Sequence, residues 1–153
     1  MHALDEYDKK LLKLLQRNNR LTTEELSSEV NLSQSAVQRR ITRLRAEKII
    51  KADVSIISPK AIGIGITCVV DVNLLEGNSK SIEAFKKSML QCQEVSQCYY
   101  VTGTYDFVLI VHTSDMAHFE EFQKRQLMDN PNLKHFYTHV VMDSVKVEYG
   151  VVL

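Results

Sequence analysis

The hydrophobic positions near the start of the chain recur with the period of an α-helix. In the first such stretch, Leu11, Leu14 and Leu15 fall on one arc, and Asp5 stands where an N-cap is expected. A second and a third stretch follow, separated by a turn of about three residues, so the two helices must cross steeply. The pattern therefore predicts a winged helix-turn-helix domain of three helices, at residues 6–17, 23–30 and 34–47.

Local capping signals support the second and third helices. Thr22 and Glu25 have the spacing of a capping box, and Leu21 and Leu26 have that of a hydrophobic staple. Ser33 occupies the N-cap position of the third helix. These signals predict that both helices begin where the hydrophobic period begins.

The pattern changes after residue 48. Residues 49–58 alternate with period two up to Pro59, which predicts a linking strand. Beyond it, period-two and helical stretches follow in the order β-α-β-β-α-β, which predicts a ferredoxin-like four-stranded antiparallel sheet with both helices on one face. The expected strands are 66–72, 95–102, 107–113 and 136–147, and the expected helices are 79–91 and a second one between Ser114 and Asn130.

The expected fold class is thus α+β with two modules. We expect a helix-turn-helix domain at 1–48, a β-strand linker at 49–61 and a ferredoxin-like domain at 62–153. The other face of the sheet carries apolar side chains, so we expect this domain to associate with a copy of itself.

Composition agrees with a compact cytoplasmic protein. Of the 153 residues, 44% are hydrophobic and 25% charged, which excludes collagen-like and wholly disordered chains. No apolar run approaches the roughly 18 residues of a spanning helix, and the N-terminus lacks the pattern of a signal peptide, so we expect a cytosolic protein without membrane contact. The three cysteines, Cys68, Cys92 and Cys98, form no CxxC pair and are expected to be reduced thiols.

A net charge of zero conceals an uneven distribution. Residues 1–60 carry 12 Lys/Arg against 8 Asp/Glu, whereas residues 61–153 carry 7 against 11. The basic half is where a polyanion would bind. On the third helix, one face carries Gln and Arg side chains, which can form bidentate hydrogen bonds with base edges in a DNA major groove. The predicted contacts with double-stranded DNA are Gln34, Ser35, Gln38, Arg39, Arg40, Thr42 and Arg43.

Several short strings, in order and at consistent spacing, carry a family resemblance over essentially the whole chain. They are Leu4-Asp5-x-x-Asp8, Asn19-Arg20-Leu21, Leu32-Ser33-x-Ser35-x-Val37-x-x-Arg40 and Val101-Thr102-Gly103-x-Tyr105-Asp106. The chain resembles the Lrp/AsnC, or feast/famine, transcriptional regulators. The resemblance implies a DNA reader, a strand linker and a ligand-sensing domain, in dimers that assemble into tetramers or octamers. It also implies a small amino acid bound between subunits, and no other cofactor.

In that family the Gly-x-x-Asp turn belongs to the effector site, which here is Gly103 to Asp106. Asp106 can accept from an ammonium group, and N–H groups beside Gly103 can donate to a carboxylate. The same turn is also what a hairpin needs for structural reasons, because Gly permits a positive φ. The effector contacts expected on this basis are Tyr100, Thr102, Gly103, Tyr105, Asp106, Thr138 and Val140, with Met116 as further lining.

One departure and two alternatives accompany this interpretation. Lys48 stands where family members have Gly after the third helix, so a left-handed residue there costs on the order of 1 kcal/mol.

The siroheme decarboxylases resemble the same two-module architecture, but the five histidines form no HExxH or Cys/His cluster, and we expect neither a metal nor catalysis. An architectural protein that coats DNA without an effector stays open.

Overall fold

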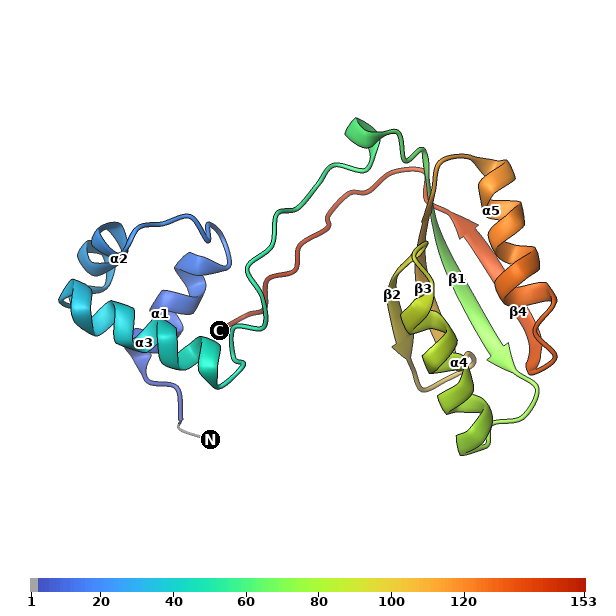
Figure 1. The fold of residues 1–153 in the computed structure, drawn as a ribbon, viewed down its shortest axis with the longest axis horizontal. Helices are drawn as coiled ribbons and strands as arrows, with labels where there is room; N and C mark the ends of the chain where they lie inside the picture. The colour runs from blue at the N-terminus through green and yellow to red at the C-terminus, as the bar shows by residue number, and fades with distance from the viewer. Residues whose placement is uncertain (1–2) are drawn as a thin grey trace. The chain divides into compact units, whose positions relative to one another are not determined.

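The computed structural model describes residues 3–153, which form two compact units. The first contains the residues up to Ile56 together with Lys146–Leu153, and the second is Ile57–Val145 (Figure 1). The predicted domain boundary at the C-terminus therefore differs from the structure, in which the end of the chain packs with the helical unit. None of the described helices is long and apolar enough to cross a membrane.

The helical unit contains the three predicted helices, α1 (Glu6–Leu15), α2 (Thr23–Val30) and α3 (Gln34–Ala46). The capping box at α2 is confirmed, because the Thr22 N–H donates to Glu25 at 2.7 Å and the Thr22 hydroxyl accepts from the Glu25 N–H. The helices meet around a core of Leu11, Leu26, Val30, Val37 and Ile41. The predicted helix-turn-helix is thus present, without a strand pair to form a wing within residues 3–56.

The end of α3 confirms the conformation predicted for Lys48. This residue has φ +56°, and its N–H donates to the Arg45 carbonyl at 3.0 Å. The Ile49 N–H reaches back to the Leu44 carbonyl at 2.9 Å, which completes a Schellman motif. The positive φ is therefore imposed by the helix end, although Lys has a Cβ.

The predicted linking strand at 49–58 is wrong. These residues run as unpaired chain in the structure, and Val54 and Ile56 are 67% and 76% exposed. Alternation alone does not make a strand, because ladder hydrogen bonds need a partner segment. Within the described chain, this segment has none.

The second unit confirms the predicted β-α-β-β-α-β order. A 3₁₀ turn (Lys60–Ile62) precedes a four-stranded antiparallel sheet with spatial order β2-β3-β1-β4. The elements are β1 (Ile66–Leu74), α4 (Ser79–Gln91), β2 (Val95–Tyr100), β3 (Phe107–Thr113), α5 (Met116–Phe122), a π-helical segment (Gln123–Met128) and β4 (Leu133–Val140).

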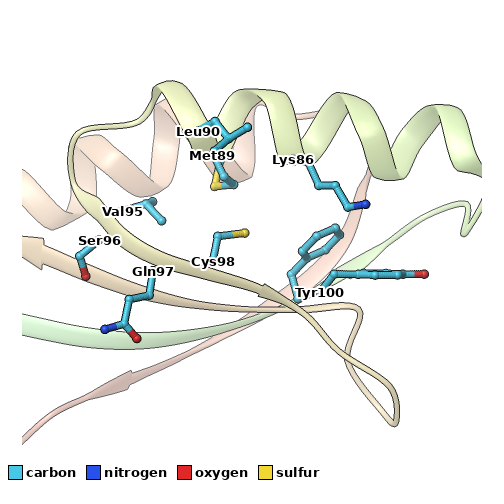
Figure 2. Close-up of a pocket in the computed structure, with 9 residues that line it drawn as sticks. Lys86, Met89, Leu90, Val95, Ser96, Gln97, Cys98 and Tyr100 are labelled. Atoms are coloured by element: carbon cyan, nitrogen blue, oxygen red, sulfur yellow. The ribbon is translucent and has the colours of Figure 1, made fainter. Parts of the chain in front are cut away.

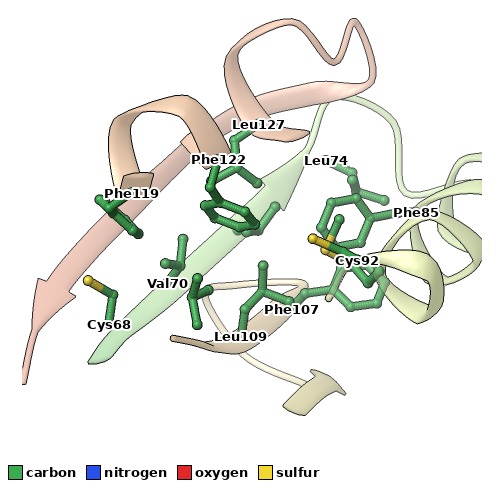
Figure 3. Close-up of a cluster of buried hydrophobic side chains, with 13 residues drawn as sticks. Cys68, Val70, Leu74, Phe85, Cys92, Phe107, Leu109, Phe119, Phe122 and Leu127 are labelled. Atoms are coloured by element: carbon green, nitrogen blue, oxygen red, sulfur yellow. The ribbon is translucent and has the colours of Figure 1, made fainter. Parts of the chain in front are cut away.

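One hydrophobic cluster joins both helices to one face of the sheet (Figure 3). Phe85 of α4 and Phe122 of α5 are almost fully buried against alternate residues of β1 and β3, such as Val70 and Leu109. The intervening residues of these strands point to the other face and are half-buried. This arrangement confirms the prediction that both helices lie on one side.

The last strand is shorter than predicted, because β4 ends at Val140 rather than at 147. The tail then returns to the helical unit, where the side-chain amide of Gln16 bonds both backbone groups of Val151, each at 3.0 Å. A Cβ on Gly150 would lie 3.4 Å from the Gln16 amide carbon. The Gln16 side chain therefore holds the tail against the end of α1. Its amide pairs with the N–H and the carbonyl of one residue, as the backbone of a neighbouring strand would.

Candidate functional site

The predicted DNA-reading face is the exposed side of α3. The side chains of this face that point to solvent belong to Gln34, Ser35, Gln38, Arg39 and Thr42. They stand opposite the buried residues Val37, Ile41 and Leu44. A helix that presents Gln and Arg on one face can form bidentate contacts with adenine and guanine edges.

Two other predicted DNA contacts, Arg40 and Arg43, are bonded within the unit. The Arg40 guanidinium lies 2.8 Å from the carboxylate of Asp8 and 2.7 Å from that of Asp5, and Arg43 bonds the second oxygen of Asp8. Asp8 is 1% exposed. These two arginines therefore fix α3 against α1, and their role on DNA stays a prediction.

The charges of this ion-pair cluster reinforce one another. The hydrogen bond that Arg40 donates to Asp8, and then the one that it donates to Asp5, raises the pKa of Arg40. The Asp8 N–H and the Arg40 guanidinium lower the pKa of Asp5. The Arg40 guanidinium also lies 5.5 Å from the centre of the Tyr7 ring. Helical periodicity cannot detect this cluster, because its acidic members lie on another helix.

The predicted effector turn is tightly bonded to the end of β1. The Asp106 N–H donates to the Val72 carbonyl at 2.9 Å, and the Asp106 carboxylate accepts from the Leu74 N–H at 2.8 Å. The Asn73 amide donates to the Thr104 carbonyl at 2.7 Å. The turn is thereby rigid, and part of the capacity of Asp106 to accept hydrogen bonds is already used.

Gly103 lies at the exposed tip of the turn between β2 and β3. Its φ of +119° lies where residues with a Cβ are strained, and a Cβ built there would meet nothing within 4 Å. Thr102, next to it, is exposed. The glycine is therefore required by the backbone, while the space above it is open to a ligand.

Thr138 and Val140 do not lie with the turn in this chain. They belong to β4, which is the opposite edge of the sheet from β2. In the register of β1 with β4, Thr138 pairs with Val70 and Val140 with Cys68, whereas the turn adjoins the Val72 end of β1. Thr138 accepts from the Gln123 amide at 3.1 Å. A single subunit therefore does not assemble all the predicted effector contacts.

The other predicted effector residues, Tyr105, Tyr100 and Met116, lie in three different places. Tyr105 makes an edge contact with Tyr137 of β4, at 5.9 Å between ring centres. Tyr100 packs on Phe107 at 5.1 Å and lines a cavity beside α4. Met116, at the start of α5, is exposed.

That cavity, of about 440 Å³, lies between α4 and β2 (Figure 2). Sequence reasoning identified only Tyr100 among its residues. Nothing in the sequence indicates the others, because the cavity exists only once α4 packs beside β2, whose residues from Cys98 to Tyr100 are all exposed. The cavity is lined by Lys86, Met89, Leu90, Val95, Ser96, Gln97, Cys98, Tyr100 and Phe107.

The described part of the chain shows no metal centre. Residues 3–153 hold no group of three or more His, Cys, Asp or Glu side chains placed to bind a metal ion. His139 instead lies 3.1 Å from Asp71, and the Thr67 hydroxyl lies 2.9 Å from His112. Both pairs are on the sheet face away from the helices. Burial lowers the pKa of His112.

Two family models match the chain. Residues 4–45 match the AsnC-type helix-turn-helix domain, and residues 67–151 match the Lrp/AsnC ligand binding domain. An uncharacterized HTH-type transcriptional regulator of Sinorhizobium fredii is 48% identical, over 97% of this chain and 88% of its own length. The proline dehydrogenase transcriptional activator of Rhizobium radiobacter is 30% identical, over 94% of this chain and 92% of its own.

Solved structures agree with these matches. A transcriptional regulator of Neisseria meningitidis, solved as a complex with L-Met, is 29% identical and superimposes with a TM-score of 0.91, over 98% of this chain and 97% of that one. The named relatives are regulators rather than enzymes. The chain belongs to the Lrp/AsnC family of DNA-binding transcriptional regulators.

Proposed function

We propose that this regulator binds specific DNA sequences and that a small amino acid, bound between subunits, changes its assembly or its DNA affinity. The observation that carries the effector part is the turn at Gly103. Open space lies above a glycine with positive φ, and a carboxylate is fixed three residues later at Asp106. Backbone that a ligand can approach and a carboxylate acceptor thus stand together, and a zwitterion needs partners of both kinds.

The DNA part of the proposal rests on the exposed face of α3. Gln38 and Arg39 stand opposite the buried face of this helix, and both side chains match base edges in the major groove. Arg40 and Arg43 hold the helix in place from the side of α1. Gln38 and Arg39 would therefore contact the bases, while the neighbouring Arg40 and Arg43 position the helix.

The subunit part rests on the sheet. The face away from the helices carries half-buried Val69, Val108 and Ile110, together with Tyr99 and Tyr137, which are 52% and 51% exposed. A second copy would cover these apolar and aromatic side chains. Effector contacts that lie on opposite edges of one sheet would then be completed from different subunits, which couples occupancy to assembly by linkage.

The test is binding of the purified protein to its own upstream DNA and to unrelated DNA, at one fixed salt concentration, with and without the twenty amino acids. Salt is fixed because phosphate contacts make affinity strongly salt-dependent. Preferential binding that amino acids shift supports the proposal. Equal binding to both DNAs with no shift contradicts it and favours an architectural protein.

A further inference from the structure

A side-chain hydrogen bond joins the start of α2 to the exposed face of α3. The Thr23 hydroxyl donates to the side-chain oxygen of Gln38 at 3.3 Å. The two helices pack against each other (Figure 1), and Leu26 and Val37 are 1% and 0% exposed in the core that they share. The first residue of one helix therefore reaches an exposed side chain of the other at a point where both backbones are fixed.

The position of Thr23 in its helix makes its hydroxyl the donor. Thr23 is the first residue of α2, so no carbonyl of that helix lies three or four residues before it. Ser27 and Ser28, further along α2, do have such a carbonyl, and both donate to that of Glu24, at 2.8 and 3.2 Å. The half-buried Thr23 donates to Gln38 instead, which holds the amide with its oxygen toward α2.

The start of α2 is rigid enough to hold this amide. The Thr22 N–H donates to the Glu25 carboxylate at 2.7 Å, and the Thr22 hydroxyl accepts from the Glu25 N–H at 3.2 Å, so the capping box fixes the first turn. The side chain of Thr23 is β-branched, which restricts its rotation about the first side-chain bond. The Thr23 hydroxyl therefore has a defined position opposite Gln38.

An amide held in this way does not treat adenine and guanine alike. A freely rotating glutamine accepts from N6 of adenine and donates to N7, which uses its oxygen and its nitrogen together. In the major groove guanine offers two acceptors, N7 and O6. With its oxygen turned toward Thr23, the exposed Gln38 keeps both amide N–H donors for a base, and these match guanine.

We propose that Thr23 is a positioning residue for sequence recognition: its hydroxyl holds the Gln38 oxygen toward α2, so that Gln38 donates to guanine and discriminates against adenine. The inference rests on the proposed function, since it concerns the DNA-reading face of α3. One hydroxyl–amide hydrogen bond favours an amide orientation by about threefold to tenfold. Loss of the hydroxyl should therefore weaken the preference for guanine by about that factor and leave the preferences at other base pairs unchanged.

The experiment selects DNA from a pool of duplexes with a fully random core, with the full-length protein at fixed salt, and sequences the bound fraction. Gln38→Ala identifies the base pair that Gln38 contacts, as the position whose preference disappears. Thr23→Val keeps the branched shape without the hydroxyl, and it should reduce the ratio of guanine to adenine at that position about threefold or more. Thr23→Ser, which retains a hydroxyl, should keep the wild-type ratio.

The matched control is Thr22→Val, at the neighbouring residue. It removes the acceptor of the Glu25 N–H, so it should lower the melting temperature but leave the ratio of guanine to adenine unchanged. Thr23→Val should do the reverse, with a melting temperature close to that of the wild type and a changed ratio. A role of Thr23 in stability alone would not alter the ratio.

The outcomes separate this inference from the proposed function. If the wild type selects no sequence, sequence-specific binding fails and the inference fails with it. If Gln38→Ala changes one position but Thr23→Val keeps the wild-type ratio there, only the inference is overturned. Preference for a base other than guanine at that position, or a Gln38→Ala variant that selects the wild-type sequence, also overturns the inference alone.

Discussion

The Arg40 guanidinium bonds the Asp8 carboxylate at 2.8 Å, across 32 residues of sequence. Arg43 bonds the other oxygen of the same carboxylate, and the carboxylate is almost inaccessible to solvent. One acidic side chain of α1 therefore fixes the rotation of α3 about its own axis. Together with the burial of Val37 and Ile41, these bonds keep Gln38 and Arg39 on the outward face.

Loss of this carboxylate should destabilise the helical unit. Asp8→Asn leaves two guanidinium groups without their buried partner, and the expected cost is about 2–3 kcal/mol. That value is below the roughly 3–5 kcal/mol of fully buried pairs, because both arginines are partly exposed. Urea unfolding followed by far-UV circular dichroism measures it.

The control for this variant is Glu6→Gln, which breaks the exposed Glu6–Lys9 pair on the same helix. It should leave the unfolding midpoint unchanged. If Asp8→Asn unfolds at the same urea concentration as the wild type, the ion-pair cluster does not hold α3 on α1.

Loss of the Arg39 side chain should affect DNA affinity, whereas loss of the Arg40 side chain should affect thermal stability. Arg39→Ala removes an exposed side chain, so it should weaken DNA binding about tenfold or more while thermal stability is unchanged. Arg40→Ala should lower the melting temperature, because it removes the bonds to Asp5 and Asp8. Fluorescence anisotropy with labelled DNA at fixed salt, beside thermal melts, distinguishes the two. A wild-type affinity for Arg39→Ala would contradict the proposed DNA-reading face.

Asp106→Asn should separate effector binding from folding. The amide oxygen can still accept the Leu74 N–H, so the turn should keep its structure. The negative charge for an ammonium group is lost, and amino-acid affinity should fall at least about tenfold while DNA binding persists. Calorimetric titration with the effector measures this. An unchanged isotherm would remove Asp106 from the site.

Acid stability should depend on Glu94. Burial opposes ionisation of this carboxyl, but hydrogen bonds from the Cys92 thiol and Arg125, together with the charge of Arg125, lower its pKa to about 2. A carboxyl whose pKa is lower folded than unfolded stabilises the protein above the unfolded value, and the contribution disappears as the pH falls from about 5 toward 2. Glu94→Gln should therefore lose less stability between pH 7 and pH 3 than the wild type.

Denaturant midpoints at the two pH values test this sign. The exposed Glu121, changed to Gln, provides the comparison on the neighbouring helix α5. A wild-type pH dependence in Glu94→Gln would show that the Glu94–Arg125 pair contributes nothing to acid stability.

Lys48→Gly should stabilise the helical unit. Lys48 has φ +56° in the Schellman motif, where a Cβ is unfavourable, and relief of this strain exceeds the extra chain entropy of an unfolded glycine. The expected gain is about 0.5–1 kcal/mol. Lys51→Gly, at an exposed position without this positive φ, should stabilise nothing. Equal effects of the two substitutions would contradict the explanation.

Local signals predicted local structure well. The capping box of Thr22 and Glu25 and the left-handed Lys48 depend on neighbours within a few residues, and both are confirmed. The order of the sheet unit followed from periodicity alone, because alternating and helical stretches differ clearly there. What these predictions share is that no distant residue is needed to decide them.

The failures depended on distant partners. Nothing near Arg40 indicates that Asp8 will reach it, and the alternation around Val54 does not reveal whether a partner strand exists. The cavity at Lys86 needs α4 and β2 to be packed before it can be seen. The role of Gln16, which bonds Val151 from 135 residues away, has no sequence signal at all.

The bonds between Gln16 and Val151 have a consequence for synthesis of the chain. The helical unit includes Lys146–Leu153, so its final segment leaves the ribosome after the whole sheet unit has been made. A nascent or truncated chain that stops before residue 146 can form the three helices but not the tail contact. Completion of the helical unit is thereby tied to synthesis of the sheet unit, so a fragment carrying only the first 56 residues lacks a contact that the helical unit has in the full chain.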